Sequence, residues 1–158
     1  MFSFVFISRT GPGESRAKGV TAFLVPLDLP GITRTHFDDL GSIIVGRGSV
    51  FFEDVRIPAS WMMGEENRGF SQIMIGFDYS RAMIALQCIA AAQASVDETW
   101  IHINDRHAFG GPLARNQGVT FPLAEAETYL EAARQICYRT LWMKDVGKHH
   151  TAEAAMCK

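Results

Sequence analysis

Residues 106–117 combine the residue types and spacing best suited to ligand binding in this chain. They place Arg106, Phe109 and Gln117 around a Gly-Gly-Pro turn. A guanidinium offers a planar set of donors that suits phosphate or pyrophosphate, a phenyl ring offers a flat apolar face, and an amide both donates and accepts. Together these groups would suit a dinucleotide. An ordinary corner between two helices, with a solvated arginine, explains the same residues, because loops rich in Gly and Pro commonly separate helices.

Two charged residues, Asp78 and Arg81, lie three positions apart in residues 77–81 (Phe-Asp-Tyr-Ser-Arg). Residues at i and i+3 share one face of a helix, so this spacing by itself predicts a solvated or intrahelical ion pair.

The thiols and a histidine pair are the remaining groups with potential chemistry. Cys88, Cys137 and Cys157 are widely spaced and form no Cys-x-x-Cys pair, which argues against a disulfide framework and a zinc site and favours reduced thiols in a cytosol. His149 and His150 could be grouped with Cys157 as metal ligands. Neighbouring side chains point to different faces, however, and no carboxylate lies at helical spacing, so a polar link without metal is the favoured interpretation.

The composition excludes several classes of protein. The chain has 158 residues, 47% hydrophobic and 20% charged, which is enough for one average domain or two smaller pieces. The net charge is −2 and the basic residues are scattered, so we expect neither a nucleic-acid partner nor a basic membrane patch. We find no apolar run near the roughly 20 residues that span a bilayer, and residues 1–7 are too short for a secretory signal core.

The pattern of the chain changes near residue 60. Before it, short runs rich in Phe, Val and Ile alternate with turn residues, which predicts antiparallel strands at residues 2–8, 20–25 and 49–57 and a turn at residues 11–13.

After residue 60, apolar residues recur at helical intervals. They predict a helix over residues 67–104 with a weak point at Gly76, a second over residues 120–145 with Pro122 in its first turn, and a third beginning at residue 151. The fold class is therefore α+β: an antiparallel β-sheet region followed by an up-down bundle of long antiparallel helices.

Seven motifs in this order resemble the acyl-CoA dehydrogenases, a flavin-dependent family. They are Arg9-Thr-Gly, Lys18-Gly-Val-Thr-Ala-Phe-Leu-Val-Pro26, Val50-Phe-Phe-Glu-Asp-Val-Arg-Ile-Pro58, Gly64-Glu-Glu-Asn-Arg-Gly-Phe70, Phe77-Asp-Tyr-Ser-Arg81, Arg106-His-Ala-Phe-Gly110 with Gln117, and Ala154-Ala-Met-Cys-Lys158. The resemblance implies a partial middle β-domain at residues 1–60 and a partial C-terminal helical domain at residues 61–158. We expect a fold that is incomplete at both ends, and thus a fragment.

The resemblance assigns the loop residues to flavin adenine dinucleotide (FAD). In this family, certain residues of one subunit contact the FAD of a partner subunit. Here these positions match Arg106, Phe109, Asn116 and Gln117. The resemblance therefore also implies a homo-oligomer, a tetramer or a dimer. This assignment replaces the ordinary-corner interpretation of the loop.

The resemblance assigns Phe77, Asp78 and Arg81 to the helix positions along an acyl-CoA substrate. Met74 and Met83, which are typical of core positions, could line an acyl pocket together with Phe77. Residues 77–81 followed by Ala-Leu-Gln-Cys look similar to members that act on cyclic acyl-CoAs such as cyclohexanecarboxyl-CoA, while short or branched acyl chains remain open.

The implied reaction is α,β-dehydrogenation of an acyl-CoA thioester, with electrons passed to an electron-transferring flavoprotein. No catalytic carboxylate is visible: in the isovaleryl-type branch it directly precedes the arginine that matches Arg81, and here that position is Ser80. The alternative is a catalytically inactive binding or oligomerisation module derived from the family. We expect a cytoplasmic protein in a bacterium, or a mitochondrial matrix protein in a eukaryote.

Overall fold

The computed structural model describes residues 3–11, 17–41 and 46–158. The predicted turn at residues 11–13 and the start of the first predicted strand lie partly outside this description. Contacts divide the chain into two compact units, Met1–Ile73 and Met74–Lys158. The predicted domain division at residue 60 follows the family's domains rather than these contacts, and it stays a prediction.

The β unit contains two small antiparallel sheets. In the first, β1 (Ser3–Arg9) pairs with β2 (Val20–Pro26), which also pairs with β5 (Met62–Met63). The second consists of β3 (Ile32–His36) and β4 (Gly48–Phe52). The sheets form because these runs are rich in β-branched and aromatic residues. The predicted antiparallel β region is confirmed, with β3 added to the strands expected from sequence.

The third predicted strand is wrong in its extent. Residues 49–57 were expected to be extended, but β4 ends at Phe52. Asp54 has a φ of 50°, in the left-handed region that an extended strand does not visit. A 3-10 helix, η1 (Ala59–Trp61), follows. The backbone reversal at Asp54 is the physical reason that the alternating pattern does not continue as a strand.

A buried hydroxyl cluster fastens the residues before the first helix to the sheet. The Thr21 hydroxyl accepts the backbone N–H of Asn67 at 2.8 Å and lies 2.6 Å from the Thr10 hydroxyl. Gly69 packs so closely on β2 that a Cβ there would lie 2.6 Å from the nitrogen of Ala22. The long helix therefore begins at a glycine because no larger residue fits against the strand.

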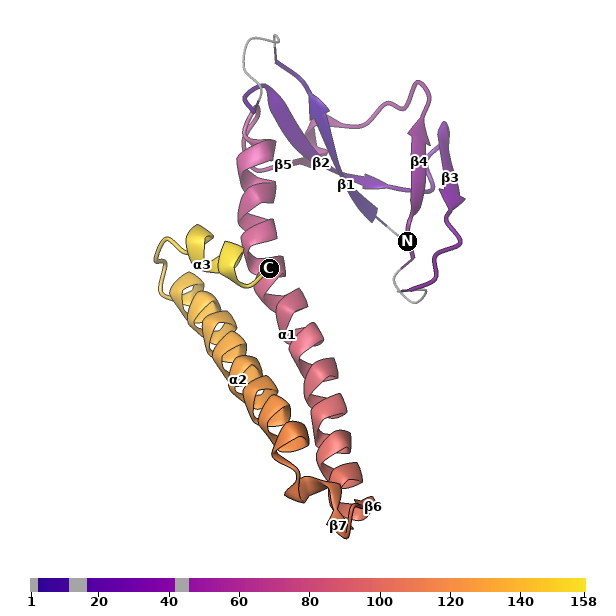
Figure 1. Cartoon of the computed structure of the whole chain (residues 1–158). Helices are drawn as coiled ribbons and strands as arrows, with labels where there is room; N and C mark the ends of the chain where they lie inside the picture. Colours follow the sequence, from indigo (N-terminus) through magenta and orange to yellow (C-terminus); the bar gives the residue numbers. More distant parts are fainter. Residues whose placement is uncertain (1–2, 12–16, 42–45) are drawn as a thin grey trace. The chain divides into compact units, whose positions relative to one another are not determined.

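Three helices follow: α1 (Gly69–Asp105), α2 (Gln117–Asp145) and α3 (Thr151–Met156). In the helical unit, α2 runs back beside α1, and α3 folds over the end of α2 (Figure 1). The predicted pair of long antiparallel helices is confirmed. The third helix has only 6 residues.

The core of the helical unit follows a coiled-coil pattern. In α1 the buried hydrophobic residues recur every seven positions: Ala82, Ile89, Val96 and Ile103. From α2 and α3, the buried positions are Cys137, Thr140, Met143 and Ala154. A seven-residue repeat keeps one face of a helix against its neighbour over several turns, which holds α1 and α2 side by side.

The second helix begins three residues earlier than predicted. Its first residue is Gln117, because the Asn116 carbonyl already accepts the N–H groups of Val119 and Thr120 at 2.9 and 3.1 Å. Pro122 therefore lies inside the helix rather than in its first turn. A proline there donates no hydrogen bond to the carbonyl four residues earlier, which is that of Gly118. Gly76, expected to be a weak point, lies within continuous helix.

Helix α1 meets the length and composition criterion for a membrane span, with an 18-residue window of mean hydropathy 1.2. The expectation that no apolar stretch approaches this length was therefore wrong by that criterion. It is a weak indication, because core helices of soluble bundles meet it equally. One face of α1 also makes polar contacts with α2, through Gln93 and Trp100.

Candidate functional site

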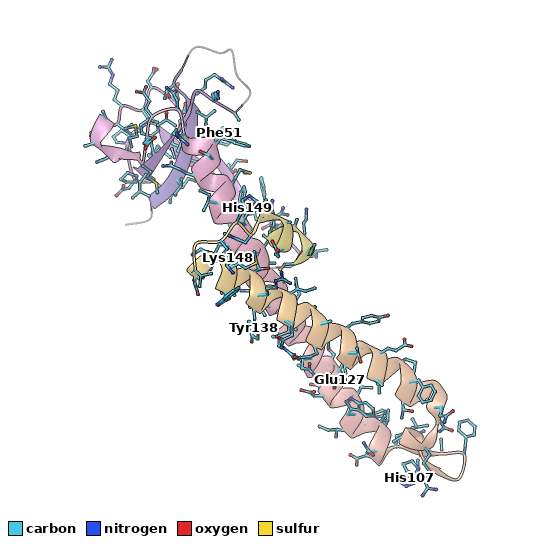
Figure 2. All side chains as sticks on the ribbon, turned by 90° about the vertical axis from the view of Figure 1, so that its left-hand side faces the viewer. Phe51, His107, Glu127, Tyr138, Lys148 and His149 are labelled. Carbon is cyan, nitrogen blue, oxygen red and sulfur yellow. The ribbon has the colours of Figure 1, made fainter. Side chains whose placement is uncertain are left out.

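The loop between α1 and α2 forms a compact structure at one end of the helical unit (Figure 1). It contains two short paired strands, β6 (His107–Ala108) and β7 (Gly111–Pro112), followed by a 3-10 helix, η2 (Leu113–Arg115). Figure 2 shows His107 at this end, beyond Glu127 on α2.

Backbone hydrogen bonds hold the base of this loop. The Arg106 N–H donates to the His102 carbonyl, and the Arg106 carbonyl accepts the Leu113 N–H, both at 2.8 Å. The Asn116 side-chain amide donates to the Leu113 carbonyl at 3.3 Å. Arg106 and Asn116, which are ten positions apart in sequence, are thus both tied to Leu113. The loop has a defined shape before any ligand binds.

The tip of the loop displays Phe109. Its side chain is 96% exposed, and its φ of 54° lies in the left-handed region. Gly110 follows with a φ of 84°. A non-glycine residue in that region costs about 1–2 kcal/mol, and a fully exposed phenyl ring recovers none of this cost by burial within the chain. This combination of strain and exposure is typical of a side chain that contacts something outside its own chain.

Arg106 and Gln117 are both exposed near this tip. Within the described part of the chain, neither side chain forms a hydrogen bond or an ion pair. Gln117 is the first residue of α2, where backbone N–H groups lack helical partners and the helix dipole is positive. The donors of the guanidinium, the amide and the helix start suit a phosphate or pyrophosphate.

The second candidate set lies in the middle of α1. Asp78 is buried, at 8% exposure, and its carboxylate accepts hydrogen bonds from Arg81 at 2.5 Å and from the Thr151 hydroxyl at 2.7 Å. The intrahelical pair expected from spacing alone is therefore present. Thr151 was not found from sequence, because nothing local indicates a partner 73 residues away. The network fastens the start of α3 to α1.

A cavity of about 420 Å³ lies beside this network. It is lined by Arg81, Ile84, Ala85 and Cys88 from α1, and by residues of α2 and the end of α3. Met74, Phe77 and Met83, which the resemblance offered for an acyl pocket, do not line it. Phe77 is half exposed. Their contact with substrate stays a prediction.

The structure does not bring the two candidate sets together. Arg81 and Arg106 are separated by 25 residues, nearly all within one continuous helix. At about 1.5 Å rise per residue, their backbones are roughly 37 Å apart. A single small ligand cannot contact both sets within one chain. Each set must therefore belong to a different site, or the loop must complete a site in another chain.

Comparisons with known proteins identify the family of the chain. The family model for the acyl-CoA dehydrogenase C-terminal domain matches residues 67–158. The mitochondrial short-chain specific acyl-CoA dehydrogenase of Rattus norvegicus is 41% identical over 142 residues, covering 89% of this chain and 34% of that protein. The cyclohexane-1-carbonyl-CoA dehydrogenase of Geobacter metallireducens is 34% identical over 156 residues, covering 98% and 40%.

A solved structure has the same fold. The butyryl-CoA dehydrogenase of Megasphaera elsdenii superposes with a TM-score of 0.88 at 30% identity, covering 98% of this chain and 40% of that one. The antiparallel sheets followed by the long helical pair are thus a fold that this chain shares with a solved acyl-CoA dehydrogenase structure. The chain belongs to the acyl-CoA dehydrogenase family. It spans 34–40% of the length of the relatives named above.

Proposed function

We propose that this chain is the C-terminal portion of an FAD-dependent acyl-CoA dehydrogenase. The proposed reaction is α,β-dehydrogenation of an acyl-CoA thioester, with electrons passed to an electron-transferring flavoprotein. Membership of the family supports the reaction class. Similarity to a cyclohexane-1-carbonyl-CoA dehydrogenase and to short-chain enzymes supports a cyclic or short acyl group.

The single observation that carries the proposal is the exposed, strained loop far from the other candidate set. In an oligomer, Arg106, Phe109 and Gln117 would contact the FAD of a partner subunit. The guanidinium and the start of α2 would pair with the pyrophosphate, the phenyl ring would cover a flat aromatic part, and the Gln117 amide would hydrogen-bond to it. FAD bound there would supply the hydride-acceptor chemistry that the proposed dehydrogenation needs.

Asn116, which the resemblance assigned to FAD, already forms hydrogen bonds within the loop. Its side-chain amide donates to the Leu113 carbonyl, and its backbone carbonyl starts α2. We propose that it positions the loop, and that contact with FAD falls to its neighbours.

On the substrate side, Asp78 and Thr151 fix the guanidinium of Arg81 beside the cavity. Arginine has five N–H donors, and the Asp78 carboxylate is its one hydrogen-bond partner among the described residues. The remaining donors are available to a polar part of an acyl-CoA. The Ser80 hydroxyl donates to the Phe77 carbonyl and cannot act as a carboxylate base. No described residue is assigned as the catalytic base.

The alternative is a binding or oligomerisation module without chemistry. It is favoured by the large apolar side chains that stay exposed on the helices, including Phe121, Tyr129, Tyr138 and Trp142. Such surfaces commonly mark contacts with other chains.

The visible absorbance of the purified chain, recorded during titration with FAD, tests the proposal. Anaerobic addition of butyryl-CoA or cyclohexanecarboxyl-CoA follows. We expect a shifted flavin spectrum on binding, and bleaching if this chain suffices for the reaction. FAD binding without bleaching of the flavin by an acyl-CoA would favour the binding or oligomerisation module without chemistry. A flavin spectrum unchanged at all concentrations would contradict FAD binding by this chain.

Matched variants distinguish a specific contact of Arg106 with FAD from a general effect of positive charge on FAD binding. We expect Arg106→Ala to weaken FAD binding by about tenfold or more, the cost of one charge-assisted contact. Arg115→Ala removes an exposed arginine from the same loop and should leave the affinity within about twofold. Equal losses in both variants would contradict a specific role for Arg106.

A further inference from the structure

All three cysteines of this chain line the same cavity. Cys88 reaches it from α1, Cys137 from α2, and Cys157 from the end of α3. Their sequence positions gave no sign of this, because the closest two are 20 residues apart. The lining is otherwise largely apolar, with Arg81 and Lys158 as its charged members.

Two of the three thiols come from adjacent parts of α2 and α3 and line one cavity. Cys157 Sγ is 3.4 Å from the hydroxyl of Thr140, which lies about one helical turn after Cys137 in α2. The pKa of the Cys137 thiol is raised to about 11, first by burial and then by its hydrogen bond with Cys157. No such contact joins Cys88 to either of them among the described residues.

We propose that Cys137 and Cys157 are a redox-sensitive pair that forms a reversible disulfide and fastens α3 to α2. Reduced thiols are the resting state of such a pair, and disulfides that form in a reducing compartment are commonly redox-sensing. The proposal goes beyond the function proposed above and uses neither FAD nor acyl-CoA.

The oxidant is a peroxide, which is small enough to enter the cavity. The thiolate of Cys157 attacks one oxygen of hydrogen peroxide, forming a sulfenic acid and, after proton transfer, one water. The Cys137 sulfur then attacks the sulfenic sulfur, the S–S bond forms, and the hydroxyl group leaves with the Cys137 proton as a second water. Two thiols and one peroxide thus give one disulfide and two waters. A dithiol reductant reverses the step by exchange.

Accessibility sets the order of the two steps. Cys137 is 1% exposed, whereas Cys157 is partly exposed. The peroxide therefore meets Cys157 first, and Cys137 acts as the resolving thiol. Cys88 is exposed and open to oxidation, but among the described residues no hydrogen bond joins it to either of the other thiols.

The disulfide would change the stability of α3. The start of this helix is held by the hydrogen bond from Thr151 to Asp78. A covalent bond at Cys157 would fix its other end. The oxidised chain would then hold the Asp78 and Arg81 network and the cavity more rigidly than the reduced chain.

Peptide mapping tests the proposal, because trypsin places the cysteines in different peptides: residues 82–106, 135–139 and 149–158. The reduced chain is treated with equimolar hydrogen peroxide, quenched with catalase, alkylated with N-ethylmaleimide and digested without reductant. We expect peptides 135–139 and 149–158 to be joined, and one alkylated thiol to remain, at Cys88. Dithiothreitol should restore all three thiols.

Variants define the outcome that would overturn the proposal. Cys88→Ser should keep the cross-link, whereas Cys157→Ser should lose it, with circular dichroism confirming that both stay helical. In the oxidised chain, amide hydrogen exchange in residues 151–156 should slow by about tenfold. Three results would each overturn the proposal. They are a cross-link from peptide 82–106 to either of the other two peptides, cross-links found only in dimers, and three alkylated thiols after peroxide treatment.

Discussion

The buried thiol of Cys137 couples folding to pH. Its pKa is raised from an ordinary 9.0 to about 11, mainly because burial disfavours the thiolate. Between these values the folded state binds a proton that the unfolded state has lost. The stabilisation is therefore fully present below pH 9 and disappears as the pH rises through the pKa of Cys137 in the folded state.

We expect the free energy of unfolding to fall by on the order of 2 kcal/mol more in the parent chain than in Cys137→Ser between about pH 9 and pH 11. Urea unfolding at a series of pH values measures this difference. Cys88→Ser, at an exposed thiol, should retain the parent's dependence. Equal pH dependence in the parent and in Cys137→Ser would contradict the assignment.

The backbone strain of the loop lies at Phe109. Substitution by glycine should relieve the strain at its φ of 54°, whereas alanine should keep the strain and lose only an exposed ring. We expect Phe109→Gly to be at least as stable as Phe109→Ala, by up to about 1 kcal/mol. Thermal unfolding compares them. A clearly less stable glycine variant would show that the loop is not strained in solution.

At the scale of elements, a polar layer interrupts the apolar contact between α1 and α2. The Glu127 carboxylate accepts hydrogen bonds from Gln93 at 3.1 Å and from the Trp100 indole at 3.2 Å. Arg134 donates to the side-chain oxygen Oε1 of Gln93 at 2.9 Å. Arg134 thus lies in the interface between the two helices. Polar groups at such positions fix the register of paired helices.

Removal of this layer should weaken the helical pair. We expect Glu127→Ala to destabilise the chain by about 1–2 kcal/mol, because it leaves two half-buried donors without their acceptor. Glu125→Ala, at an exposed position on the same helix, should stay within about 0.5 kcal/mol of the parent. Chemical denaturation measures both. If Glu127→Ala leaves the free energy of unfolding unchanged, apolar contacts alone set the register of the two helices.

Two glycines of the helices should respond in opposite directions to the same substitution. Gly76 is exposed within α1 and has open space around its Cβ position, so Gly76→Ala should stabilise by about 0.5–1 kcal/mol. Gly147 ends α2 with a φ of 70°, so Gly147→Ala should destabilise by about 1 kcal/mol. Thermal unfolding of both variants checks the signs. Equal signs would contradict this account of the helix geometry.

At the scale of the whole molecule, exposed apolar surface predicts association. Along the helical unit, Ile75, Ile84, Ile101, Phe121, Tyr129 and Trp142 are all exposed. Monomeric proteins rarely leave so many large apolar side chains in water. We expect self-association at micromolar concentration, measured by size-exclusion chromatography with light scattering. A well-behaved monomer under those conditions would count against both the oligomeric site and the module.

Local sequence determined the elements and the family. Apolar residues at helical intervals predicted the two long helices to within three residues, because a helical face is encoded by near neighbours. The Gly-Gly-Pro turn marked the loop, and ordered motifs indicated the family that the comparisons show. The sequence pattern did not reveal that β4 ends before Asp54, because a single residue with a left-handed backbone leaves no periodic signal.

Tertiary structure alone decided which distant groups meet. Thr151 binds Asp78, Arg134 donates to Gln93, and Cys157 lies against Thr140, although the two members of each pair are 17 to 73 residues apart in sequence. The register of α2 on α1 and the fold-back of α3 set these pairings. Both depend on the summed burial of many side chains, which no local pattern encodes, because each residue type fits equally well at several registers.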